Sequence, residues 1–160
     1  VRDLGCCPSP FDSYLMTLGL ETLSLRVRHE VESARRLAEY CRNHPKVERV
    51  SFVGFESHPS YANAKKYFRF GSSAVFTIEL KGTLDSTVRF VESLNLAAHM
   101  VMIGDSVTVV THPASTTHKQ LSDADLAAAG VTPTMLRISV GLENTDDLID
   151  DFEQAFAHIG

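Results

Sequence analysis

Residues 134–140 read TMLRISV, and this stretch sets the expected architecture of the chain. Successive side chains of a β-strand point to opposite faces of the sheet. One face of this stretch carries three branched apolar residues, Leu136, Ile138 and Val140. The other face carries Met135, Arg137 and Ser139. We therefore predict a strand whose apolar face packs on a core and whose opposite face holds Arg137 away from that core.

Long helices are predicted on both sides of this strand in the sequence. Ser9 and Pro10 are typical of a helix start, and Gly19 weakens that first helix. A longer helix is expected at about 22–43, before Pro45. The last helix begins at about Thr145, and its apolar face consists of Leu148, Ile149, Phe152, Ala155, Phe156 and Ile159.

The middle of the chain predicts further strands at 47–53, 73–80, 99–103 and 107–110. The last two flank Gly104-Asp105, a pair that favours a turn. Shorter helices are expected at 61–68, at about 122–130, and after Asp85 as its N-cap. The expected fold is therefore α+β, or a loosely built α/β layer, in which a mostly antiparallel sheet has helices packed on one face.

Composition restricts the class of protein. A chain of 160 residues is long enough for one core, and its net charge of −5 argues against a nucleic-acid surface. No apolar run reaches the roughly 20 residues that span a bilayer, so no membrane partner is expected. Three cysteines, two of them adjacent, favour free thiols and a cytoplasmic location. The first residue is not Met, and we expect a piece of a longer protein.

Several candidate chemistries are weakly supported. His112 and His118 are six residues apart without an acidic residue between them, so a structured loop is favoured over a metal site. Cys41 falls on the inward face of its helix, which favours a buried thiol over a nucleophile. The lysines all lie in polar or surface contexts: Lys46, Lys65, Lys66, Lys81 and Lys119. Arg137 could bind a carboxylate through two hydrogen bonds, or form a surface ion pair, and its spacing alone leaves both open.

The motifs HPASTTH (112–118), LRISVGLEN (136–144) and DLIDDFEQAF (147–156) resemble the C-terminal end of the Cys/Met-metabolism enzymes that use pyridoxal 5′-phosphate (PLP). The opening, VRDLGCCPSPFDSYLMTLGLETLSLR, resembles the join between the large and small domains of that family. The resemblance implies that residues 1–20 are a connecting helix. It implies that residues 21–160 are the C-terminal substrate-binding domain of a fold-type I PLP enzyme.

Within the family, GLETL (19–23) and IGD (103–105) resemble the O-acetylhomoserine sulfhydrylase branch. This branch implies replacement of the acetate of O-acetylhomoserine by sulfide or a thiol, in homocysteine and methionine biosynthesis. A domain of a cystathionine γ-synthase, a γ-lyase or a methionine γ-lyase is the alternative within the family. A non-catalytic assembly module is the alternative outside it.

The resemblance also implies roles for single residues. Arg137 matches the family's arginine that binds the substrate α-carboxylate. Met102 stands where the family has Ser or Asn near the substrate, and Met cannot donate a hydrogen bond. Thr117 matches a loop that shapes the active site. Glu30 and Ser33 replace residues that are often His and Asn in relatives, and we interpret this change as local packing.

The sequence contains no S-x-T-K motif. The resemblance places the Schiff-base lysine and the phosphate-binding residues in a large N-terminal PLP domain upstream. We therefore expect no catalytic, cofactor-binding or metal-binding residue in this chain, and no activity when it is isolated. The expected partners are that missing domain, a small amino-acid substrate, and copies of the full-length enzyme in a homo-oligomer, specifically a tetramer.

Overall fold

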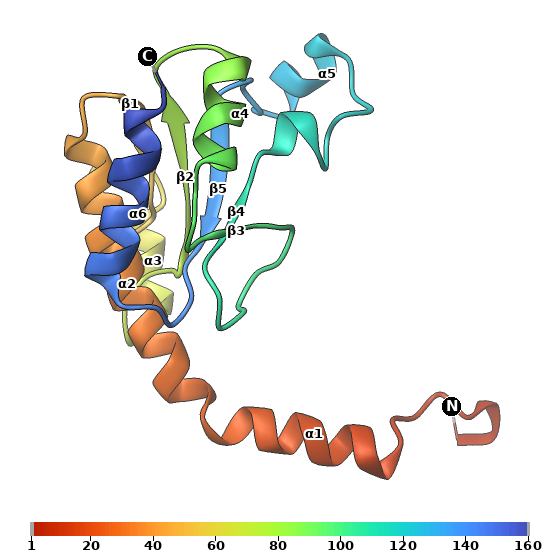
Figure 1. The fold of residues 1–160 in the computed structure, drawn as a ribbon. Coiled ribbons are helices and arrows are strands. Elements are labelled where there is room, and N and C mark those ends of the chain that lie inside the picture. The colour runs from red at the N-terminus through yellow and green to blue at the C-terminus, as the bar shows by residue number, and fades with distance from the viewer. Residues whose placement is uncertain (1, 160) are drawn as a thin grey trace.

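The computed structural model describes residues 2–159, and the TMLRISV stretch forms the middle strand of its sheet (Figure 1). The sheet has five strands in the order β1-β2-β5-β4-β3. Their bounds are β1 Val47–Ser51, β2 Val75–Leu80, β3 Ala98–His99, β4 Val109–Thr111 and β5 Met135–Ser139. All pairs are antiparallel except β3 with β4, which is parallel. The predicted mostly antiparallel sheet is therefore confirmed.

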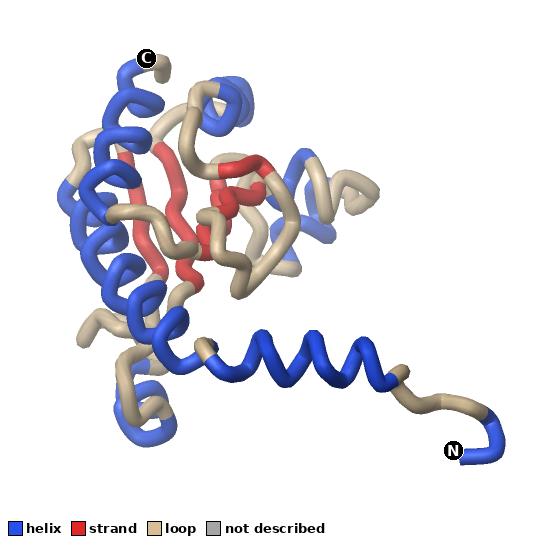
Figure 2. The backbone as a smooth tube through the Cα atoms, turned by 60° about the horizontal axis from the view of Figure 1, so that its bottom comes forward, coloured by secondary structure: helices blue, strands red, loops and turns tan. Residues whose placement is uncertain are grey.

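The predicted helices are present, with shifts of a few residues at some ends. They are α1 Pro10–Glu21, α2 Leu23–Asn43, α3 Tyr61–Tyr67, α4 Leu84–Glu92, α5 Asp123–Ala128 and α6 Thr145–Ala157, with short 3₁₀ turns η1 at Arg2–Leu4 and η2 at Pro113–Ser115. Helices α2, α4 and α6 cover one face of the sheet (Figure 2). Arg137 lies on the opposite face of the sheet, because Leu136 and Ile138, its neighbours in β5, point to the covered face.

The core lies between the sheet and these three helices. The apolar face of β5 is fully buried, with Leu136 and Ile138 at 0% exposure, as is Val140 just after the strand. Phe90 of α4 and Phe156 of α6 pack above it with 4.7 Å between their ring centroids. Burial of each such side chain stabilises the fold by about 2 kcal/mol. This packing fixes β5 and therefore fixes the direction of its outer face.

Helix starts follow local capping rules, with one correction. In α1 the Ser9 hydroxyl accepts from the Asp12 N–H at 3.1 Å, and the Asp12 carboxylate accepts from the Ser9 N–H at 3.2 Å. The prediction that Asp85 caps α4 is wrong. Thr83 is the N-cap and Asp85 lies in the first turn. Threonine is the better cap there because its hydroxyl accepts from the N–H three residues later.

The predicted strand at 99–103 is also wrong. Only Ala98–His99 is a strand, and it pairs parallel to β4 instead of forming a hairpin with it. The loop side chains that follow are between 47% and 62% exposed: Met100, Val101, Met102 and Ile103. No buried face holds these residues in an extended ladder, so the apolar run does not continue the strand.

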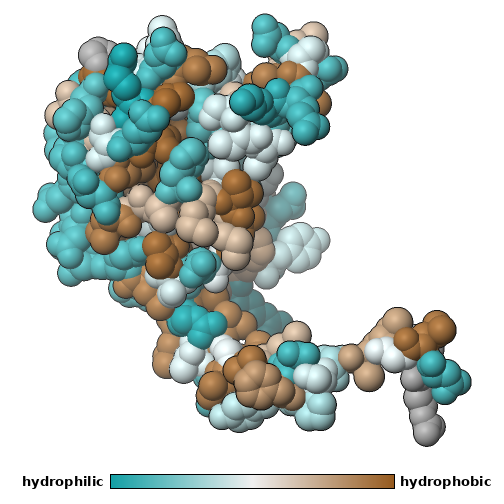
Figure 3. All heavy atoms as spheres, turned by 45° about the vertical axis from the view of Figure 1, so that its right-hand side comes forward, coloured by the Kyte–Doolittle hydropathy of each residue, from teal (hydrophilic) through white to brown (hydrophobic). Residues whose placement is uncertain are grey.

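Helix α1 projects from the body as an arm and has no buried residue (Figures 1 and 3). Its exposed large apolar side chains are Phe11, Tyr14, Leu15, Met16, Leu18 and Leu20. At the bend into α2, the Arg26 guanidinium donates to the Gly19 carbonyl at 3.1 Å. Within residues 2–159, no helix has the length and apolar character needed to cross a bilayer.

Candidate functional site

Arg137 lies on the outer face of the middle strand, as the alternation predicts. Its neighbours in register are Thr77 of β2 on one side and Thr111 of β4 on the other. The side chain is partly buried, and the strand beneath it is fixed by the core on the opposite face. The guanidinium is therefore held on a rigid support and not on a mobile loop.

The guanidinium has only weak contacts with its own chain. Nη2 of Arg137 donates to the Met102 carbonyl at 3.4 Å and to the Thr111 hydroxyl at 3.3 Å. Nε of Arg137 is buried and has no hydrogen-bond partner among residues 2–159. In the same range, no Asp or Glu oxygen lies within ion-pair distance of it. A buried cationic donor without an acceptor favours an anionic ligand, and a planar guanidinium matches a carboxylate.

The loop 100–106 lies against this guanidinium. The Thr111 hydroxyl donates to the Met100 carbonyl at 2.6 Å, and the Gly104 N–H donates to the Ser139 hydroxyl at 3.3 Å. Met102 contacts Arg137 through its backbone, whereas its side chain is 47% exposed. The structure therefore brings Met102 to the candidate site through its carbonyl, which any residue could supply.

A hollow of about 490 Å³ lies beside this loop. Residues 102–106 form one wall, and Gly19 and Arg26 at the bend between α1 and α2 form the other. The candidate site therefore borders the base of the α1 arm.

The motif HPASTTH forms a structured loop. His112 is 1% exposed, and its Nε2 lies 2.8 Å from the Pro133 carbonyl, while its Nδ1 lies 2.8 Å from the Ser115 hydroxyl. A carbonyl can only accept, so Nε2 of His112 donates to Pro133, and in the neutral ring Nδ1 then accepts from the Ser115 hydroxyl. Histidine here joins this loop to the segment before β5, and no group of three potential metal ligands occurs in the described part of the chain.

Thr117 and His118 lie at the outer end of that loop. The Thr117 hydroxyl lies 2.8 Å from Nδ1 of His118, and the Thr117 side chain is exposed. Within residues 2–159, no hydrogen bond joins Thr117 to Arg137. The structure joins Arg137 to Met102 and Thr111 by hydrogen bonds, whereas the described hydrogen bond of the Thr117 side chain is with His118.

Thr111 contacts Arg137 in the candidate site, and the sequence analysis did not predict it. It is 1% exposed, and it faces Arg137 across the β4–β5 pair. A polar residue at the end of the VTVVT stretch was the available signal. That signal has no meaning until the pairing of β4 with β5 is known, and this pairing joins residues 26 positions apart.

The other reactive side chains have local roles. Nζ of Lys46 donates to the Phe156 carbonyl at 2.7 Å, and Nζ of Lys81 donates to the Pro45 carbonyl at 2.9 Å. Lys65 and Lys66 lie over tyrosine rings of α3. Burial raises the pKa of the Cys41 thiol, which makes this thiol a poor nucleophile near neutral pH.

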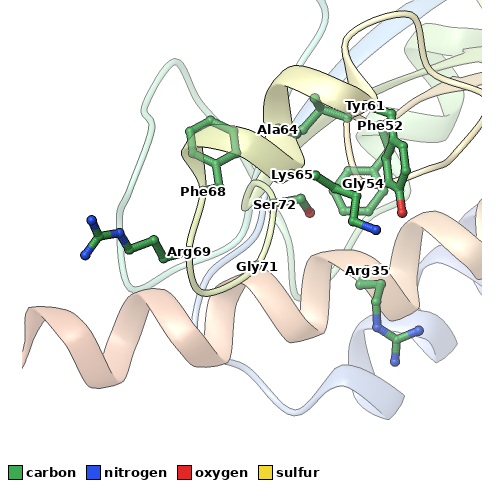
Figure 4. Close-up of a pocket in the computed structure, with 11 residues that line it drawn as sticks. Arg35, Phe52, Gly54, Tyr61, Ala64, Lys65, Phe68, Arg69, Gly71 and Ser72 are labelled. Carbon is green, nitrogen blue, oxygen red and sulfur yellow. The ribbon is translucent and has the colours of Figure 1, made fainter.

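A separate cavity of about 400 Å³ lies between α2 and α3 (Figure 4). Among its lining residues, Arg35 is ion-paired with Glu32 and Glu39, and Figure 4 shows Arg69 pointing away from the cavity. Its polar groups do not converge on one point, and Arg137 is not among its lining residues.

Arg137 thus faces outward from the middle strand of a sheet that helices cover on the other face. Residues 1–157 match the model of the family described as Cys/Met metabolism PLP-dependent enzyme. The chain belongs to this family.

Among its relatives, the homocysteine synthase of Schizosaccharomyces pombe is 46% identical over 97% of this chain. The O-acetyl-L-homoserine sulfhydrylase 1 of Thermus thermophilus is 43% identical over 98%. A crystal structure of a putative O-acetylhomoserine (thiol)-lyase from Campylobacter jejuni, with N'-pyridoxyl-lysine-5'-monophosphate, superposes with a TM-score of 0.88 at 37% identity and covers 98% of this chain. The chain spans only 36% to 37% of the lengths of these three proteins.

Proposed function

We propose that this chain is the C-terminal substrate-binding domain of a PLP-dependent O-acetylhomoserine sulfhydrylase, a transferase. Residues 1–20 connect it to an upstream PLP domain, and residues 21–160 are the domain itself. The full-length enzyme replaces the acetate of O-acetylhomoserine with sulfide or a thiol, in methionine and homocysteine biosynthesis. Relatives that are named homocysteine synthase and O-acetyl-L-homoserine sulfhydrylase, at 40% to 46% identity, support this assignment.

The observation that carries the proposal is the unpaired guanidinium of Arg137. Among residues 2–159 its buried Nε has no acceptor, and the carboxylate of an amino acid would supply one. A charge-assisted hydrogen bond from Nε to that carboxylate would fix the position of the substrate. Arg137 is therefore the substrate-binding residue of this domain, Met102 is the adjoining wall, and Thr117 shapes the edge of the site.

PLP, when bound in the full-length enzyme, supplies an electron sink for negative charge that develops next to the substrate amine. The lysine that holds it belongs to the upstream domain in this proposal. The contacts of Lys46, Lys81, Lys65 and Lys66 support that placement, because a Schiff-base lysine needs an unoccupied and desolvated amine. The isolated chain is therefore expected to lack both activity and covalently bound PLP.

The partners of this domain are the upstream PLP domain and copies of the full-length enzyme, in a cytoplasmic homotetramer. The arm α1 supports this, because its apolar side chains are exposed along its whole length, with Phe11 at 67% and Met16 at 64% (Figure 3). A contiguous apolar surface of this kind usually marks an interface between proteins or domains.

The test compares acceptors in the purified full-length enzyme with O-acetylhomoserine as donor. We expect sulfide or a small thiol to give faster replacement than cysteine. A preference for cysteine would identify a cystathionine γ-synthase, and release of a keto acid without any acceptor would identify a lyase. An upstream reading frame without an S-x-T-K motif would favour the non-catalytic assembly module.

A further inference from the structure

We propose that Thr111 is a positioning residue that sets the orientation of the Arg137 guanidinium for binding the substrate carboxylate. This inference rests on the proposed function. It assigns a role to a residue of β4. In this proposal Thr111 touches neither the substrate nor the cofactor, and it acts through Arg137.

The hydrogen-bond direction at Thr111 is fixed by its surroundings. Its single hydroxyl proton goes to the Met100 carbonyl at 2.6 Å, because a carbonyl oxygen can only accept. The hydroxyl oxygen is then free to accept from Nη2 of Arg137 at 3.3 Å. Thr111 is 1% exposed, so water cannot easily replace either contact.

These contacts orient the guanidinium. The two protons of Nη2 are used by the Thr111 hydroxyl and by the Met102 carbonyl. Because the guanidinium is planar, holding one of its nitrogens from two directions also sets the directions of Nε and Nη1. Nε has no acceptor, and Nη1 makes no hydrogen bond within residues 2–159. Thr111 thereby holds the Nε donor of Arg137 in one orientation.

The same hydroxyl holds the wall of the site. Met100 and Met102 belong to one loop, and Thr111 binds the first while Arg137 binds the second. Loss of the hydroxyl would free the loop and the guanidinium together. A change of this kind weakens carboxylate binding and leaves the chemical steps on the bound substrate intact.

The sheet supplies a matched control. Thr77 faces Arg137 from β2, in register, just as Thr111 does from β4. Within residues 2–159, no hydrogen bond joins Thr77 to Arg137. Thr77→Val and Thr111→Val therefore make the same chemical change on either side of one arginine, and only the second removes a hydrogen bond to it.

The experiment measures KM and kcat for O-acetylhomoserine in the full-length enzyme. We expect Thr111→Val to raise KM by about tenfold with kcat changed less than about twofold, because a hydrogen bond to a charged group is lost. Thr111→Ser, which keeps the hydroxyl, should restore KM, and Thr77→Val should match the unaltered enzyme. Inhibition provides a second readout. Thr111→Val should weaken inhibition by L-norvaline. Inhibition by butylamine, which lacks only the carboxylate, should not change.

The outcomes separate this inference from the function it rests on. If Arg137→Ala raises KM and Thr111→Val behaves like Thr77→Val, the positioning role is wrong and the carboxylate site stands. If Arg137→Ala also leaves KM unchanged, the carboxylate site itself is wrong. If Thr111→Ser is as impaired as Thr111→Val, the side chain acts through packing and the inference fails. Equal weakening of inhibition by L-norvaline and by butylamine would also overturn the inference.

Discussion

The side-chain carboxylate of Asp151 on α6 accepts a hydrogen bond from the backbone N–H of Ala97, with 3.0 Å between the two atoms. The same carboxylate accepts from the N–H groups of Asn95 and Leu96, at 2.8 Å and 3.0 Å. Asp151 is 5% exposed, and Ala97 immediately precedes β3. One buried acid therefore joins the last helix to the start of the edge strand.

Replacing Asp151 should destabilise the fold strongly. Asp151→Ala leaves three backbone donors without their acceptor, and we expect the free energy of unfolding to fall by about 3 kcal/mol. Asp151→Asn should lower the free energy of unfolding by less, since the amide oxygen of Asn can still accept a hydrogen bond. Thermal and urea unfolding of the full-length enzyme measure both. The control is Asp150→Ala, at the exposed neighbouring position, and an equal loss in that variant would contradict the prediction.

Replacing Arg137 should weaken substrate binding. Arg137→Ala removes the cation and its charge-assisted hydrogen bond to the carboxylate, and we expect KM for O-acetylhomoserine to rise by roughly 100-fold. The visible absorbance of the PLP enzyme should not change. Arg137→Lys should be intermediate, because an ammonium group keeps the charge but lacks the planar guanidinium that Thr111 and Met102 orient. Arg89→Ala, an exposed arginine of α4, is the control, and unchanged kinetics in Arg137→Ala would refute the role.

Adding one methyl group at Gly141 should disturb the loop beside the candidate site. A Cβ at this position would lie 2.5 Å from the Ser106 carbonyl oxygen and 2.6 Å from the Thr108 nitrogen. Backbone atoms cannot rotate away as a side chain can, so Gly141→Ala should lower the free energy of unfolding by about 1–3 kcal/mol. Gly19→Ala is the control, because open space surrounds that position and alanine favours a helix. Equal unfolding temperatures for the two variants would contradict this prediction.

The buried Glu30 carboxyl should destabilise the fold at neutral pH, where it is charged, and not in acid, where it is protonated. Burial raises the pKa of the Glu30 carboxyl, and the nearby charges of Arg26 and His29 oppose this only in part. The stability that Glu30 contributes is present below its ordinary pKa and is lost as the pH rises through the raised value. Glu30→Gln should therefore raise the unfolding temperature at pH 7 and change it little at pH 4.

Glu32, on the same helix, supplies a control of opposite sign. Its hydrogen bond to Arg35 lowers the pKa of the Glu32 carboxyl, so its contribution is present at neutral pH and lost as the pH falls. Glu32→Gln should lower the unfolding temperature slightly at pH 7, because exposed pairs contribute little. If Glu30→Gln and Glu32→Gln shift stability in the same direction at pH 7, the interpretation of Glu30 is wrong.

Local features of this fold were predictable because their causes are local. The capping of α1 depends on Ser9 and Asp12, three positions apart, and both faces of β5 follow from alternation within 134–140. The apolar face of α6 likewise follows from helical spacing. Where the sequence was misleading, at 99–103, an apolar run predicted a strand, yet its side chains remain about half exposed.

The sequence by itself determined that β5 buries Leu136 and Ile138 and turns Arg137 to the other side, because side-chain direction in a strand depends only on parity. Tertiary structure alone decided what meets that guanidinium. Thr111 reaches it through the pairing of β4 with β5, and Met102 reaches it through the fold of a loop 35 residues away in the chain. Contacts of this kind depend on strand order and register, which the packing of the whole core selects and no short pattern encodes.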